Sequence, residues 1–159
     1  DLTTLDGLGF ALDAGAKELY RLEPSDRTQT ILPLPDEVVI TDSGNLDMVG
    51  GLGSIWIVQG GVLYRIDPAS GDLTATVELG GGDYAALATG EGYVWVLEGG
   101  AGDTSGGRLF KVDPDTAEVV GEPLEFEGQL VDVAAGGGSV WVTSRNPDVL
   151  LQIAPSGAE

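Results

Sequence analysis

The chain has 159 residues, 42% of them hydrophobic, with 26 glycines, which is enough for one domain with a sizeable core. Its 26 acidic and seven basic residues give a net charge of −19, so nucleic acid is not an expected partner. The absence of cysteine and histidine excludes disulfides, thiolate nucleophiles and Ser-His-Asp arrangements. No apolar run approaches the roughly 18 residues of a membrane span, and residues 1–20 lack the pattern of a signal peptide, so neither is expected.

Four similar units follow one another along the chain. With Leu12, Trp56, Trp95 and Trp141 in one column, spaced by 44, 39 and 46 residues, the preceding segments are LTTLDGLGFAL, LDMVGGLGSIW, AALATGEGYVW and VDVAAGGGSVW. The segments downstream are LYRLEP, LYRIDP, LFKVDP and LQIAP. On this alignment the first two units match without a gap from residue 2 to 24 and from 46 to 68. Such a period predicts a repeat architecture, with units at about 1–44, 45–83, 84–129 and 130–159.

Each unit is predicted to contain short antiparallel strands. In the second unit a strand at Leu46–Val49 ends at a Gly-x-Gly turn, and Ser54–Gln59 is apolar at consecutive positions, which indicates burial on both faces. A third strand, Val62–Asp67, ends in the turn sequence DPASG, and a fourth spans Leu73–Leu79. The last unit has three expected strands, Val131–Ala134, Ser139–Ser144 and Asp148–Ile153, and no outer strand.

Four-stranded sheets buried on both sides and repeated about every 40 residues predict an all-β fold, a β-propeller of about four blades whose last blade is incomplete. The three tryptophans are expected to wedge between adjacent blades. Three arrangements stay open: a segment of a larger propeller, a half-ring that pairs with a second copy, or a four-bladed ring with one thin blade. The incomplete blade edges also predict self-association.

The segment GSIWIV…GVLYRIDPASGDLTATVELG resembles the YVTN-type repeats of bacterial propellers and their streptogramin-lyase-like relatives. The resemblance covers nearly the whole chain and implies the propeller fold and an extracytoplasmic or secreted location. It also implies rings larger than four blades, which favours a segment or a half-ring. Streptogramin lyases depend on a catalytic histidine and a metal ion, so the absence of histidine means that their activity does not carry over.

The lengths of the units vary on one face. Alternating strand directions put the Gly-x-Gly and Asp-Pro turns on one face, and the loops between second and third strands on the other, together with the connections between blades. The extra segments EGGAGDTSGG and PDEVVITDSGN both fall on this second face. Variable loops on a rigid scaffold concentrate binding residues. We therefore predict a surface for a protein, glycan or small ligand around Asp36, Glu37, Asp42, Asn45, Asp83, Glu98, Asp103, Arg145, Asn146 and Asp148.

Two carboxylates form the candidate metal site. Asp47 and Asp132 share a column of the first strands with Thr3 and Ala86, and first strands line the central channel of a propeller. Oxygen ligands there suit a hard divalent cation, and a hydrated channel without a specific ion is the alternative. No other cofactor is expected. The acidic residues of Asp113–Glu118 are not repeated at the aligned positions of the other units, which favours a turn over a calcium site.

Two functions remain from the sequence. The first is a non-catalytic extracytoplasmic propeller domain that binds a ligand or protein, or that builds a larger assembly. The alternative is a hydrolase or lyase that uses carboxylates or a metal on the propeller face, since 26 acids make close pairs expected by chance.

Overall fold

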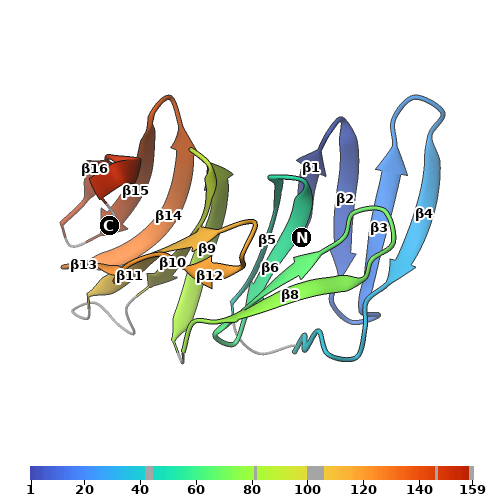
Figure 1. Cartoon of the computed structure of the whole chain (residues 1–159), viewed down its shortest axis with the longest axis horizontal. Coiled ribbons are helices and arrows are strands. Elements are labelled where there is room, and N and C mark those ends of the chain that lie inside the picture. The colour runs from blue at the N-terminus through green and yellow to red at the C-terminus, as the bar shows by residue number, and fades with distance from the viewer. Residues whose placement is uncertain (42–44, 81, 100–105, 146, 158–159) are drawn as a thin grey trace.

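The computed structural model describes residues 1–41, 45–80, 82–99, 106–145 and 147–157, and of residues 83–85 the backbone only. Four antiparallel sheets follow one another in a row, each built from one unit of the repeat (Figure 1). The all-β propeller architecture predicted from the sequence is confirmed. No helix in the described part of the chain is long and apolar enough to cross a membrane.

The first two sheets are regular four-stranded meanders. The strands of the first sheet are β1 (Leu2–Leu5), β2 (Leu8–Asp13), β3 (Glu18–Glu23) and β4 (Thr28–Pro33). Those of the second sheet are β5 (Leu46–Gly51), β6 (Ser54–Gln59), β7 (Val62–Ile66) and β8 (Leu73–Glu78). Every residue of β6 is buried, as its continuous apolar run predicts.

The third sheet has a divided outer strand. Its inner strands are β9 (Asp83–Gly90), β10 (Tyr93–Gly99) and β11 (Gly107–Asp113), and both β12 (Glu118–Val119) and β13 (Leu124–Phe126) pair with β11. The break contains Gly121, whose φ is 71°, and Pro123, which has no N–H to donate to the ladder. A single fourth strand was expected here, so the sequence prediction missed this interruption.

The fourth sheet has three strands, β14 (Gln129–Gly136), β15 (Ser139–Arg145) and β16 (Val149–Ile153), followed by a 3₁₀ turn, η1 (Pro155–Gly157). Within the described residues no outer strand pairs with β16, as the sequence predicts.

The tight turn between the first two strands shows that the sequence alignment of unit one is wrong by two residues. The turn residues 6–7, 52–53, 91–92 and 137–138 all have positive φ, as a type I′ hairpin requires. This register makes Phe10, not Leu12, the equivalent of Trp56, and Gly7 the equivalent of Gly53. The hairpin between β2 and β3 is two residues longer than the one between β6 and β7, which hid the shift.

The core lies between the sheets in three clusters, one for each pair of neighbouring sheets. Phe10, Trp56 and Trp95 are fully buried and pack on the following sheet, which confirms the wedge role for both tryptophans. The indole N–H of each tryptophan donates to the carbonyl of Gly51, Gly90 or Gly136 at 3.3, 3.1 and 3.4 Å. Trp141 is only half-buried, because within the described residues no further sheet packs on the fourth one.

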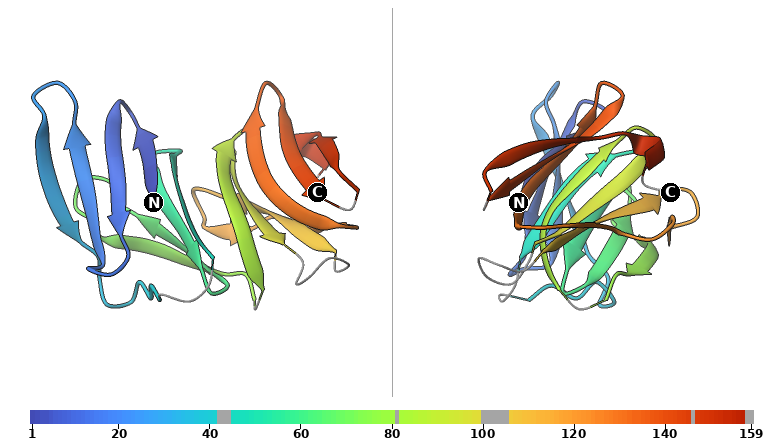
Figure 2. Two further views of the ribbon diagram at one scale, coloured as in Figure 1. Left: turned by 180° about the vertical axis from the view of Figure 1, so that it is seen from behind. Right: turned by 90° about the vertical axis from the view of Figure 1, so that its left-hand side faces the viewer.

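The row of sheets has two distinct edges (Figures 1 and 2). One edge, here called the Gly-turn edge, carries the turns between first and second strands, at residues 6–7, 52–53, 91–92 and 137–138. It also carries the turns between third and fourth strands. The variable-loop edge holds the loops between second and third strands and the connections between sheets. The first sheet lies at one end of the row and the fourth sheet at the other.

Candidate functional site

The predicted binding residues gather along the variable-loop edge where they are described. Asp36 and Glu37 lie between β4 and β5, and both are exposed. Asn45 precedes β5, Asp83 begins β9, Glu98 lies near the end of β10, and Arg145 and Asp148 flank the loop between β15 and β16. Asp42, Asp103 and Asn146 lie outside the described residues. The binding surface at these residues stays a prediction.

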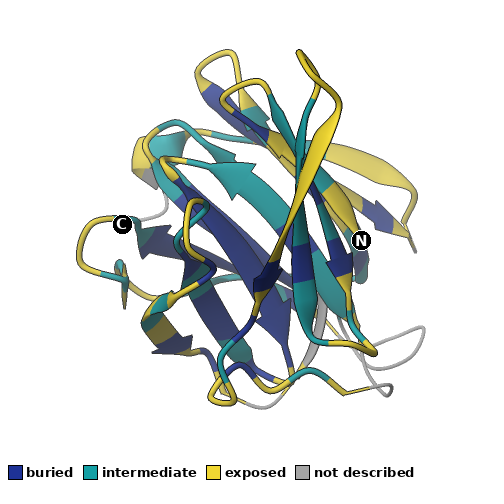
Figure 3. Ribbon diagram, turned by 90° about the vertical axis from the view of Figure 1, so that its right-hand side faces the viewer, coloured by how far each residue is buried: buried dark blue, intermediate teal, exposed yellow. Residues whose placement is uncertain are grey.

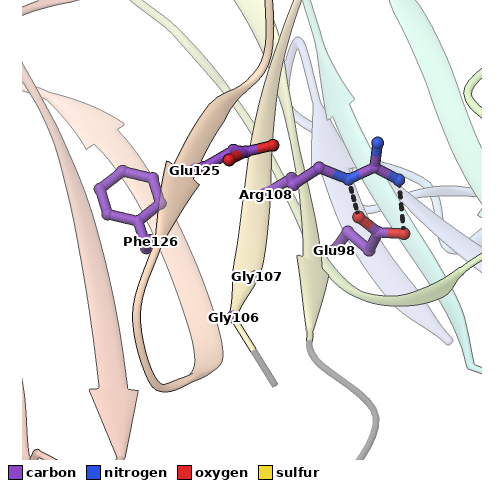
Figure 4. A pocket seen from close by; sticks show the side chains of 6 residues that line it. All are labelled: Glu98, Gly106, Gly107, Arg108, Glu125 and Phe126. Atoms are coloured by element: carbon purple, nitrogen blue, oxygen red, sulfur yellow. Dashed lines mark hydrogen bonds and ion pairs between the residues drawn. The ribbon is translucent and has the colours of Figure 1, made fainter. Parts of the chain in front are cut away.

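One feature of this edge is a crevice next to Glu98. Glu98 on β10 stands directly opposite Arg108 on β11, and the two side chains form a bidentate pair (Figure 4). In this pair Arg108 Nη2 donates to Glu98 Oε1 at 2.9 Å, and Nε donates to Oε2. The guanidinium carbon also lies 5.1 Å from the centroid of the Phe110 ring. Such a pair has fixed, planar geometry, and Glu98 is almost fully buried within it.

Three glycines allow the chain to close around this pair. A Cβ at Gly82 would lie 1.7 Å from the Glu98 carboxylate, one at Gly106 would lie 2.3 Å from the Phe126 carbonyl, and one at Gly107 would lie 2.6 Å from the Glu98 carbonyl. The resulting hollow, of about 260 Å³, is lined by Glu98, Gly106, Gly107, Arg108, Glu125 and Phe126. In Figure 4 the Glu125 carboxylate lies beside Arg108, while the Phe126 ring points away from the pair.

Sequence reasoning named Glu98 but missed Arg108, Glu125 and Phe126. Glu98 and Arg108 flank the same hairpin, so opposite charges at its two ends were a usable signal. The contribution of Glu125 and Phe126 depends on β13 pairing with β11, and nothing in the local pattern predicts that pairing.

A second hollow of the same edge lies at the corresponding place in the second sheet. Gln59 occupies the position of Glu98, and its amide holds the incoming connection through Thr41: Nε2 donates to the Thr41 carbonyl at 2.7 Å and Oε1 accepts from its N–H at 3.0 Å. The Tyr64 hydroxyl accepts from the Val39 N–H at 3.3 Å. The hollow, of about 260 Å³, is lined by Val39, Thr41, Gln59, Gly60, Val62 and Tyr64. The edge therefore offers two hollows with different polar side chains.

The channel carboxylates share one local geometry. Each accepts the N–H of the next residue: Asp47 Oδ1 from Met48 at 2.8 Å and Asp132 Oδ1 from Val133 at 2.9 Å. Asp1 does the same with Leu2, and its backbone pairs with Leu12 as that of Asp47 pairs with Val58. The first sheet therefore contributes Asp1 to the column of Asp47, Ala86 and Asp132. The prediction that placed Thr3 in this column was wrong, because the sequence alignment of unit one was shifted by two residues.

The second carboxylate oxygen of Asp47 already has a partner, since Oδ2 accepts the Leu87 N–H from the next sheet at 2.6 Å. Burial raises the pKa of Asp47 and the charge of Asp132 adds to the rise, while the N–H donors of Leu87 and Met48 oppose it. Within the described residues no three His, Cys, Asp or Glu side chains are grouped so as to hold a metal. The cation hypothesis for Asp47 and Asp132 remains a prediction, and the visible role of Asp47 is to link two sheets.

The acidic segment Asp113–Glu118 forms a turn on the Gly-turn edge. Asp113 Oδ1 accepts the N–H groups of Asp115 and Thr116 at 2.8 and 3.0 Å, and Asp67 Oδ1 accepts those of Ala69 and Ser70 in the same way. These carboxylates therefore fold their own backbone, as the turn interpretation predicts.

Comparisons with known proteins support the fold and leave the family open. No family model matches the sequence, and a sequence search of curated proteins finds no match. The structure is similar to Kuenenia stuttgartiensis hydrazine synthase, with a TM-score of 0.69 and 10% identity over 90% of this chain. It is also similar to the computationally designed Ika4 protein, with a TM-score of 0.64 and 11% identity over 96% of this chain and 88% of that one. BamB from Moraxella catarrhalis has a TM-score of 0.64 and 13% identity over 96% of this chain. The chain spans 42% of the length of the hydrazine synthase chain and of BamB.

Proposed function

We propose that this chain is a non-catalytic β-propeller domain of the YVTN type that acts outside the cytoplasm, binding a protein, glycan or small ligand at its variable-loop edge or building a larger assembly. The observation that carries the proposal is the concentration of length variation at one edge of the repeat. The turns between third and fourth strands at the other edge, 24–27, 67–72 and 114–117, vary less than the loops between second and third strands. The loops between second and third strands differ in every sheet, while the turns of residues 6–7, 52–53, 91–92 and 137–138 keep one length. A rigid scaffold with variable loops is a common basis for binding surfaces. The location rests on the resemblance to YVTN-type repeats.

The charges of the edge favour a partner with cationic groups. Asp36, Glu37 and Asp148 are exposed along it, and Glu125 is exposed at the rim of the Glu98–Arg108 crevice. Complementary charge raises the association rate and adds specificity, provided that the charged groups are held in a fixed geometry. The crevice offers that geometry, because its ion pair is held rigidly between two strands.

The non-catalytic part of the proposal rests on the residue inventory. The chain has no histidine and no cysteine, so the commonest general base and the thiolate nucleophile are absent. A hydrolase or lyase would have to work with carboxylates, and the two carboxylates singled out in the channel are engaged by backbone N–H groups.

The test is an NMR titration of the isotope-labelled chain with three probes: an oligolysine peptide, an oligoglutamate peptide and a neutral oligosaccharide. We expect oligolysine to shift the amide signals of residues 36, 37 and 148. The double variant Glu37→Gln/Asp148→Asn should weaken oligolysine binding by about 2- to 10-fold, as expected for two exposed charge pairs.

The matched control is Asp6→Asn/Asp115→Asn, which removes the same two charges from exposed positions of the Gly-turn edge. It should bind oligolysine like the unaltered chain. Signal shifts confined to the Gly-turn edge, or an equal loss of affinity in the control, would overturn the placement of the binding surface.

A further inference from the structure

We infer that the two end faces of the row of sheets bind each other between two copies of this chain, with the fourth sheet of one copy packed on the first sheet of the other. The inference rests on the assembly part of the proposed function and names its partner. We call the face of a sheet toward the preceding sheet its leading face, and the face toward the following sheet its trailing face. The leading face of the first sheet and the trailing face of the fourth are the two end faces.

The trailing face of the fourth sheet carries side chains that are buried everywhere else in the repeat. Leu150 lies opposite Thr143 on the neighbouring strand. At the same position of the other three sheets, Leu19, Leu63 and Leu109 lie opposite Leu12, Val58 and Leu97. Leu150 is 64% exposed, whereas Leu19, Leu63 and Leu109 are 0%, 0% and 1% exposed. Trp141 stands beside it at the position of the buried Trp56 and Trp95, at the rim of a hollow of about 130 Å³. This face therefore keeps the leucine and the tryptophan of an internal face without their cover, although Thr143 stands where the other three sheets have an aliphatic side chain.

The leading face of the first sheet shows the complementary pattern. Leu2 is 68% exposed, while the equivalent Met48, Leu87 and Val133 are 4%, 7% and 6% exposed. Leu2, Ala11, Tyr20 and Ile31 form one row across the four strands. Figure 3 looks at this end of the molecule, where the strands are mainly exposed or intermediate in burial. A folded chain loses favourable free energy by leaving such rows in water.

The innermost strands also match in shape. Where β5 meets β9, Gly51 faces Thr89, and a Cβ on Gly51 would lie 2.0 Å from Thr89 Oγ1. The Thr89 hydroxyl donates to the Gly50 carbonyl at 3.2 Å, which joins the two sheets. In the proposed contact the corresponding pair is Gly136 on the trailing face and Thr4 on the leading face of the partner. Nothing lies within 4 Å of a Cβ built on Gly136, so the end face offers the same space that Gly51 gives to Thr89.

Charge and symmetry favour a second copy as the occupant. Arg145, one of the seven basic residues, ends β15 on the trailing face at the variable-loop edge, and Asp13 and Glu18 lie on the leading face at that same edge. A contact between different faces closes a ring only if the rotation allows it. Two copies contribute eight sheets, which is within the roughly four to eight blades of known propellers. We therefore infer a closed pair with two identical contacts.

The test is the solution mass of the chain by light scattering and analytical ultracentrifugation. We expect twice the chain mass for the unaltered protein. Leu150→Glu and Leu2→Glu each place a carboxylate on one end face at an exposed site, and each should raise the dissociation constant at least about 100-fold, because an unpaired charge is buried in both contacts. Val39→Glu is the matched control, since Val39 is 56% exposed and lies away from both end faces. It should leave the mass unchanged.

Mixing the two variants separates this arrangement from others. The Leu150→Glu chain keeps its leading face and the Leu2→Glu chain keeps its trailing face, so the mixture should form a heterodimer through one intact contact, more weakly than the unaltered pair. A monomeric unaltered chain, a dimer insensitive to either substitution, or a mixture that stays monomeric would overturn the inference. Binding of oligolysine by the monomeric Leu150→Glu chain shows separately whether the variable-loop edge functions.

Discussion

At the scale of single residues, the contribution of each repeated tryptophan to stability depends on whether a following sheet packs on it. Trp56 and Trp141 make the same hydrogen bond to a glycine carbonyl, yet among the residues that the structure describes a following sheet covers only Trp56. The difference in their contributions to stability therefore measures the packing between sheets, separated from the packing within one.

Trp56→Ala should lower the free energy of unfolding by about 3–5 kcal/mol, the usual cost of emptying a buried aromatic site. Trp141→Ala should cost about half as much when the chain is monomeric, because part of its ring is already in water. Urea denaturation of dilute protein measures both. Equal losses for the two variants would contradict the difference in burial.

The turn aspartates make a second residue-scale prediction, in pH dependence. N–H donors of Ser70 and Ala69 hold the pKa of Asp67 below its usual value, and those of Thr116 and Asp115 do the same for the pKa of Asp113. An aspartate with a lowered pKa in the folded state contributes stability above its unfolded pKa of about 4, and this stability is lost as the pH falls through the folded-state pKa.

Asp67→Asn/Asp113→Asn keeps the acceptor oxygen and removes the titration. Between pH 7 and pH 3 this variant should lose less unfolding free energy than the unaltered chain. Asp6→Asn/Asp115→Asn, which removes two exposed carboxylates from the same edge of the molecule, is the control for the overall change in charge. If both variants follow the same acid profile, the turn carboxylates are not responsible.

At the scale of strands and sheets, close approach of the innermost strands decides which glycines matter. A Cβ on Gly90 would lie 2.7 Å from the Ala135 carbonyl of the next sheet, while Gly136 at the same repeat position has open space. Gly90→Ala should destabilise the chain by about 1–3 kcal/mol through overpacking. Gly136→Ala should leave the monomer unchanged or more stable by about 0.5 kcal/mol, because alanine has less conformational freedom to lose.

Thermal and urea unfolding of dilute protein compare these two variants. A loss at Gly136 as large as that at Gly90 would show that the end face is not open. At higher concentration Gly136→Ala should also weaken the proposed pair of copies, since its methyl group would meet Thr4 of the second copy.

The elements themselves were largely predictable, because each strand is a local apolar run between turn residues. The strand Ser54–Gln59 was predicted with both bounds as found. The three strands of the last unit were found in the expected order, with bounds that differ by at most two residues. The first unit was aligned two residues out of register, because its longer hairpin after β2 offset a displaced glycine pair. The hydrophobic pattern is the same with or without the displaced turn and the longer hairpin, because the two changes cancel along the chain. The positive φ of Asp6 and Gly7 shows where the turn lies and so fixes the alignment.

The crevice was less predictable than the strands, since it is assembled from residues of different strands. Glu98 and Arg108 are neighbours across a hairpin, but Glu125 reaches them only because the outer strand of the third sheet is broken and restarts as β13. Gly121 and Pro123 mark the break in the sequence, whereas the return of β13 to pair with β11 is a long-range contact that a local pattern does not specify.

At the scale of the whole molecule, the net charge of −19 acts against both folding and association. Like charges within about 10 Å repel one another at 0.1 M salt, and at 1 M salt the screening length falls to about 3 Å. The favourable free energy that holds the sheets together against this repulsion comes from the burial of apolar side chains between them.

Raising NaCl from about 0.1 M to 1 M should therefore raise the melting temperature of the monomer and lower the dissociation constant of the proposed pair. The Glu122→Gln/Glu127→Gln variant, which removes two exposed charges, should respond less to salt in both measurements. Both quantities are measured on the same protein preparation, the melting temperature by differential scanning calorimetry at low concentration and the dissociation constant by ultracentrifugation at higher concentrations. A salt response that does not shrink in the variant would show that the effect comes from salting-out of apolar surface and not from screening of the acidic charge.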